Sequence, residues 1–269
     1  MSEPIDEATH ARPELDLLSK QVAGMQRSWK RELPMLEALA AQGDVARNFL
    51  QDVVQDYYWR SVSYGEACWT LLQRGDGISF LPIMRSLYEA SLALAFLRDR
   101  DEAERKREAQ VAIAHELYHV LWQIQKEKRP DQEGKIASDV ADNLRELGEL
   151  IPEDVLTVAE KRSSCFSWTG LDASRLITLY DSQNPYLLYS NLSNLAHGHH
   201  KLIARHVMRW TPEKYEEQAA HARMRLKQVR RSMQDLLALR FSDPEIDELM
   251  PGDVMLVRMP HANIRTARP

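Results

Sequence analysis

The chain has 269 residues, 44% hydrophobic and 28% charged, which is the balance of an ordinary soluble globular protein. Glycine (10) and proline (12) are sparse, and this favours helices over a turn-rich β architecture. The net charge of −5 gives no general attraction to nucleic acid, so RNA or DNA binding would need a local basic patch. Two cysteines, Cys68 and Cys165, are too few for a disulfide framework and indicate a reducing cytoplasm.

Apolar spacing predicts an all-α fold, a multi-helix bundle with peripheral N- and C-terminal arms. We expect an arm at residues 1–13, a single helical domain at 14–241 and an extended tail at 242–269. The N-terminal arm lacks the basic start and apolar run of a signal peptide. Within the domain, the spacing predicts helices at about 15–25, 34–39, 44–74 and 78–97, and another that follows the charged run 98–108 and ends at about 126. Further helices are predicted at 136–147, 152–161 and 172–180, from 184 onward, and at 212–241.

Residues 78–97 form the most apolar stretch, with only two charges, Arg85 and Glu89. These lie four residues apart, so on a helix they share a face and pair. Pro82 and the two charges argue against a membrane span, because charges at mid-bilayer are costly. We therefore expect a core helix that carries a buried ion pair.

The last long helix carries apolar residues that alternate in steps of four and three. They are Tyr215, Ala219, Ala222, Leu226, Val229, Met233 and Leu236. Such a stripe predicts a seam inside one bundle, and a homodimer through the 212–241 helix is the alternative. The other faces carry five basic residues, which we expect on a solvated surface as the best local basic patch. These are Arg223, Arg225, Lys227, Arg230 and Arg231.

Two metal sites are open hypotheses, and the cofactor is unknown. His115-Glu116-Leu117-Tyr118-His119 fits the H-E-x-x-H pattern of zinc proteases, although no strand pattern accompanies it. A di-metal carboxylate site would instead combine Glu89, Glu116 and His119 with three later residues. Those three are Glu160, Asn194 and His197, and Asn194 stands where the scheme requires a glutamate.

A further hypothesis joins Arg85 and Glu89 to a second polar face. Tyr189, Ser193 and His197 follow one another in steps of four, so they share one side of a helix. If the two helices pack together, Glu89 and His197 form an acid/base pair, and Arg85 keeps Glu89 ionised. A network that only fixes helix register is the structural alternative.

Three blocks carry a family resemblance: 84–109 with its R-S-L-x-E core, 166–180 around Trp168 and Gly170, and 186–200 with its S-x-x-x-H-G pattern. In these blocks the chain resembles the uncharacterised prokaryotic domain-of-unknown-function family fifty-six seventy-seven. The resemblance implies a helical cytoplasmic protein and gives no activity.

In size and helical style the chain is also similar to the nuclease and toxin folds of prokaryotic defence systems. Those folds place an arginine four to six residues before a histidine, and none of the nine histidines here has one. We therefore predict a binding, regulatory or defence-associated module. The alternative is an enzyme, either metal-dependent or RNase-like through His197.

Overall fold

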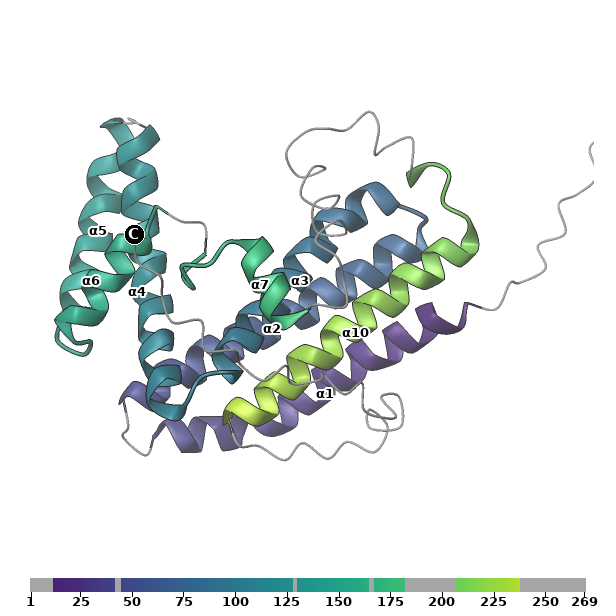
Figure 1. Ribbon diagram of the computed structural model, residues 1–269, viewed down its shortest axis with the longest axis horizontal. Coiled ribbons are helices and arrows are strands. Elements are labelled where there is room, and N and C mark those ends of the chain that lie inside the picture. Colours follow the sequence, from purple (N-terminus) through teal and green to yellow (C-terminus); the bar gives the residue numbers. More distant parts are fainter. Residues whose placement is uncertain (1–11, 42–44, 128–129, 165–166, 182–206, 238–269) are drawn as a thin grey trace, which may run out of the picture.

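A computed structural model describes residues 12–41, 45–127, 130–164, 167–181 and 207–237, which form eight helices and no strand. The all-α prediction is confirmed for this part of the chain (Figure 1). The helices are α1 (Pro13–Ala40), α2 (Val45–Gln73), α3 (Gly77–Arg98), α4 (Glu102–Glu127), α5 (Pro130–Gly148), α6 (Glu153–Arg162), α7 (Ala173–Tyr180) and α10 (Pro212–Leu237). The helix predicted from residue 184 lies outside the described residues, and the predicted domain limits stay a prediction.

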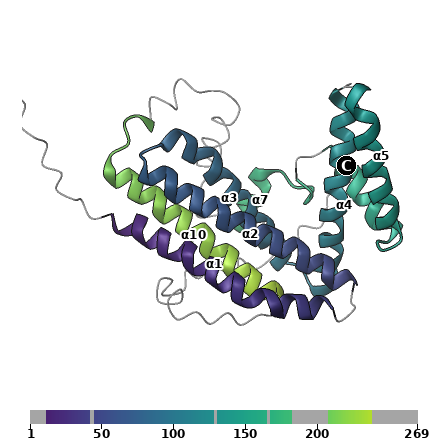
Figure 2. The ribbon, with the colours of Figure 1, turned by 180° about the vertical axis from the view of Figure 1, so that it is seen from behind.

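Four long helices, α1, α2, α3 and α10, run side by side, and α4, α5 and α6 pack together at one end of them (Figures 1 and 2). The short helix α7 lies against α3. Two hydrophobic cores follow from this arrangement. The larger core lies between the long helices, and the smaller one joins Val111 and Ala114 of α4 to Val155 and Ala159 of α6.

Helix α3 is the central apolar element that the sequence predicted. Asp76 caps its start by accepting a hydrogen bond from the Ser79 backbone N–H at 3.0 Å. Gly75 precedes it at φ +70°, a conformation that glycine adopts without steric cost. The helix is long and apolar enough to cross a membrane, but 67% of its most apolar window is buried inside the protein. This burial is what a core helix requires.

Pro34 does not begin a new helix, contrary to our prediction. Helix α1 continues through it to Ala40, although proline removes one backbone donor. Packing against α2 offsets that loss, because Leu36 is fully buried and its carbonyl accepts a hydrogen bond from Gln51 Nε2 at 2.6 Å.

The apolar stripe of α10 packs inside the protein, against α1, α2 and α3. Ala219, Ala222, Leu226 and Val229 are completely buried. The stripe therefore forms the predicted intramolecular seam, and the predicted homodimer would have to use other residues of this helix.

Two of the five basic residues of α10 are not on a solvated surface, which corrects our expectation. Arg225 is only 1% exposed and Arg230 only 4%. Arg223 forms an ion pair with Glu14 of α1. The wrong assignment arose because α10 is covered on several sides by neighbouring helices, so a polar residue on it can still be buried.

Truncating the seam should destabilise the bundle. Leu226 is fully buried, and its Cδ1 lies only 2.8 Å from where a Cβ on Gly65 would stand. We expect Leu226→Ala to lower the free energy of unfolding by about 2–5 kcal/mol in urea titrations, because it opens a cavity. Leu179→Ala, at a site 49% exposed, is the control and should change it by less than about 0.5 kcal/mol. Equal effects would contradict the packing.

Candidate functional site

The predicted pair of Arg85 and Glu89 forms and is partly buried. Arg85 Nε donates to Glu89 Oε1 at 2.9 Å, and the side chains are 16% and 31% exposed. The core-facing positions of this turn are Met84 and Tyr88, which are both 2% exposed. The expected buried ion pair is therefore only partly buried, because it lies on a side of α3 that retains access to solvent.

The other half of that predicted site is Tyr189, Ser193 and His197. All three lie outside the described residues, so the contact between Glu89 and His197 stays a prediction.

The buried polar cluster of the core consists instead of Tyr88, Asp181 and Arg225. The Arg225 guanidinium donates to Asp181 Oδ2 at 2.5 Å, and the Tyr88 hydroxyl donates to the same oxygen. The guanidinium carbon also lies 3.9 Å from the centre of the Tyr88 ring, which is a cation–π contact. The charged pair is almost completely buried, with Asp181 only 5% exposed. The cluster thus ties α3 and the residue after α7 to α10.

Burial also affects the ionisation of groups around this cluster. It raises the pKa of Tyr88, which keeps the hydroxyl protonated as a donor. His221 precedes Arg225 by one helical turn, and burial lowers the pKa of its imidazole, with the charge of Arg225 acting in the same direction. The buried Nδ1 of His221 has no hydrogen-bond partner within the described residues.

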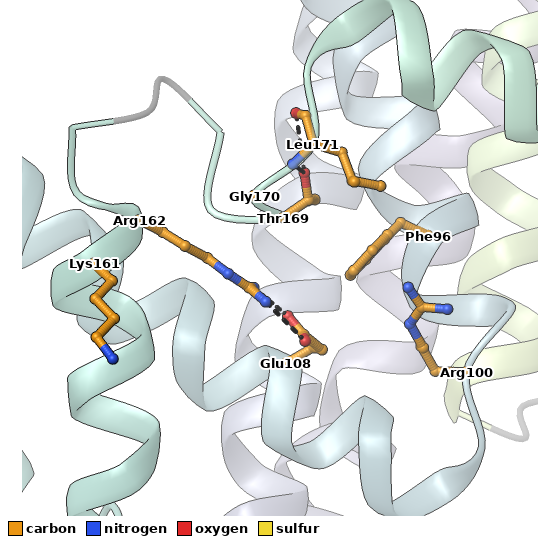
Figure 3. A pocket seen from close by; sticks show the side chains of 8 residues that line it. All are labelled: Phe96, Arg100, Glu108, Lys161, Arg162, Thr169, Gly170 and Leu171. Carbon is orange, nitrogen blue, oxygen red and sulfur yellow. Dashed lines mark hydrogen bonds and ion pairs between the residues drawn. The ribbon is translucent and has the colours of Figure 1, made fainter. Parts of the chain in front are cut away.

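A pocket of about 340 Å³ lies where α3 ends, beside α4, α6 and the loop before α7 (Figure 3). Two of the three sequence blocks meet here, since 84–109 and 166–180 each contribute three lining residues. The lining residues are Phe96, Arg100, Glu108, Lys161, Arg162, Thr169, Gly170 and Leu171.

Arg162 holds one wall of this pocket in place. Its guanidinium donates to Glu108 Oε2 at 2.7 Å and to the carbonyl of Trp168 at 2.9 Å. Gly170 lies at φ +70°, and a Cβ there would stand 2.9 Å from Arg162 Nε. Glycine is therefore needed for this loop to lie so close to the arginine.

Trp168 fixes the same loop to the long helices. Its indole Nε1 donates to the Tyr57 hydroxyl of α2 at 2.6 Å, and its ring meets Phe96 of α3 edge to face at 5.5 Å between centroids. Burial raises the pKa of Tyr57 to about 12, so this hydroxyl stays neutral.

The H-E-x-x-H segment supports α6 and does not fit a zinc site. One imidazole nitrogen of His115 donates to the Arg162 carbonyl at 3.1 Å, and His119 Nδ1 donates to the Ser163 carbonyl at 2.7 Å. His119 Nε2 lies 2.9 Å from Gln123 Nε2, so both nitrogens of this ring are engaged. Glu116 points to solvent, 66% exposed and 3.6 Å from Arg60.

The di-metal hypothesis gains no support from the described part of the chain. Glu89 is engaged by Arg85, while Asn194 and His197 lie outside the described residues. Among the residues that the structure describes, no group of three or more His, Cys, Asp and Glu side chains could hold a metal ion.

Comparison with known proteins assigns the chain to a family but assigns it no activity. The profile of a family of unknown function, DUF5677, matches residues 51–215, which include all three sequence blocks. The chain belongs to this family. No curated protein and no solved structure matches it. The pocket and its two blocks therefore lie within the part of the chain that defines DUF5677.

Sequence reasoning missed the two most developed clusters. Tyr88 is the unspecified residue of the R-S-L-x-E core, and no role was predicted for it from the sequence. Arg225 was expected on a solvated surface. Asp181 follows the short helix α7, so no helical spacing relates it to other polar residues. The pairing of Glu108 with Arg162 spans 54 residues, which no local spacing reveals.

Breaking the Asp181–Arg225 pair should be costly, since it leaves a buried charge without its partner. We expect Asp181→Asn to lower the free energy of unfolding by about 3–5 kcal/mol, measured by urea denaturation. Asp139→Asn, at an exposed site on α5, makes the same chemical change and should have almost no effect. A loss below about 1 kcal/mol for Asp181→Asn would show that the pair is not buried as described.

His221 should make folding stability depend on pH. Its pKa is lowered in the folded protein from 6.5, so the unfolded chain binds the proton more strongly. The free energy of unfolding is therefore highest above pH 6.5, where the imidazole is neutral in both states, and it falls as the pH drops from 6.5 toward the folded-state pKa. Urea titrations across this range should show a steeper loss for the wild type than for His221→Gln. Identical pH profiles would contradict the burial of this imidazole.

Proposed function

We propose that this DUF5677 protein is a binding module for a small molecule, with the pocket between α3, α4, α6 and the loop before α7 as its site. The observation that carries the proposal is the meeting of two family blocks at one cavity. A volume of about 340 Å³ lies at the lower end of the range for small-molecule sites. Two apolar side chains, Phe96 and Leu171, and several charged groups line it, a mixture that suits a small polar ligand.

The rigidity of the pocket wall supports binding. Glu108 holds the side chain of Arg162, and His115 holds its carbonyl. Trp168 anchors the loop before α7 to Tyr57 of α2. Such a preorganised wall loses little conformational entropy when a ligand enters.

The chemistry of the lining favours binding over catalysis. Of the lining side chains, the only carboxylate is Glu108, which Arg162 engages, and none is a histidine or a cysteine. Among the described lining residues, Thr169 and Lys161 are the other candidates for catalysis, but the Thr169 hydroxyl is engaged by Ser167 and by the Leu171 backbone, and the Lys161 side chain points away from the other charges (Figure 3). The enzyme alternative through His197 rests on a residue outside the described part of the chain.

We also propose a cytoplasmic protein. Cys68 is a free thiol, completely buried, and free thiols persist in a reducing compartment. Burial raises the pKa of this thiol, so Cys68 is a packing residue and not a reactive one.

Filling the pocket should abolish ligand binding. Ligand-observed NMR against a fixed set of small anionic, cationic and neutral compounds will identify binders of the wild-type protein. We expect these compounds to lose binding to Leu171→Trp, because the indole occupies the cavity. Leu179→Trp makes the same substitution at an exposed site on α7 and should retain binding.

Circular dichroism and the melting temperature show whether both tryptophan variants fold. If no compound binds, or if the folded Leu171→Trp variant binds as the wild type does, the pocket is not the site.

A further inference from the structure

We infer that the ligand of this pocket carries an anionic group, a carboxylate or a phosphate, and that Arg100 is the residue that receives it. This inference rests on the proposed function and adds the chemical class of the ligand. The lining contains three basic residues, Arg100, Lys161 and Arg162, and one acid, Glu108. Because Glu108 pairs with Arg162, the remaining charge of the lining is positive.

Arg100 is the cation best placed to bind. Its guanidinium carbon lies 4.4 Å from the centre of the Phe96 ring, so the ring supports it and limits its freedom. Phe96 is itself 2% exposed, which makes this support rigid. Among the residues that the structure describes, no carboxylate forms an ion pair with Arg100. A stacked guanidinium of this kind keeps its N–H groups at the edge for a bidentate anion.

The other two basic residues have different roles. Figure 3 shows Arg162 reaching toward Glu108 from α6, on the side of the pocket opposite Arg100. Lys161 points away from both. We therefore assign direct contact to Arg100, and only a favourable electrostatic field to Lys161.

The size and polarity of the cavity limit the ligand further. About 340 Å³ has room for inorganic phosphate or a small carboxylic acid. The nearby loop offers Thr169, whose hydroxyl already contacts Ser167 Oγ at 2.8 Å and the Leu171 backbone N–H at 3.2 Å. Recognition of the anion therefore falls mainly to the arginine.

The test is isothermal titration calorimetry of the full chain with four probes at constant ionic strength: inorganic phosphate, malate, choline and glucose. Constant ionic strength separates binding from charge screening. Phosphate and malate distinguish the two anionic groups. We expect at least one of them to bind, and choline and glucose not to bind.

Arg100→Gln should weaken the anion's binding by about tenfold or more, the usual effect of losing a charge-assisted hydrogen bond. Arg209→Gln removes the same charge at an exposed site that does not line the pocket and should leave the affinity unchanged. Arg100→Lys keeps the charge without the planar fork and should lie between the two. Melting temperatures show whether each variant folds.

Several results would overturn the inference. One is equal anion affinity in the wild type and Arg100→Gln, and another is equal weakening by Arg100→Gln and Arg209→Gln. A third is the absence of binding by both anions. Binding of choline or glucose that Leu171→Trp abolishes would also overturn it, yet would leave the pocket as a ligand site. The failure of the inference is thus distinct from the failure of the proposed function.

Discussion

The buried ion pair between Arg225 and Asp181 is the interaction on which the arrangement of the long helices depends. A guanidinium that is 1% exposed is stable in an apolar interior because the Asp181 carboxylate, the Gln228 side-chain oxygen and the Tyr88 ring surround it. The pair ties α10 to the residue that follows α7, and Tyr88 joins both to α3. The apolar stripe of α10 then packs among α1, α2 and α3, and α7 is kept beside α3.

The pocket follows from this arrangement at the other end of α7. With α7 held on α3, the preceding loop brings Thr169, Gly170 and Leu171 to the end of α3, next to Phe96. Helix α4 binds the end of α6 through three side chains on one face, Glu108, His115 and His119. The two histidines of the H-E-x-x-H segment thus hold the end of α6, and together with Glu108 they position Arg162 beside the cavity.

The sequence could predict what depends on local periodicity. It predicted the all-α class, most helices, the seam of α10 and the pairing of Arg85 with Glu89, because each is set by residues three or four positions apart. It could not predict burial that depends on neighbours distant in the chain. Arg225 has the same local signal as a surface arginine, and Glu108 reaches Arg162 only through the packing of α4 on α6. The polar face of Tyr189, Ser193 and His197 stays a prediction.

The central claim is that the pocket beside Phe96 binds a small anion. Crystals of the full chain soaked in selenate, an anomalous scatterer of the size and charge of phosphate, test it most directly. We expect an anomalous peak within hydrogen-bond distance of the Arg100 guanidinium, and none there in Arg100→Gln crystals. Selenate bound elsewhere on the surface, with the pocket empty in crystals soaked in selenate and in crystals soaked in malate, would contradict it.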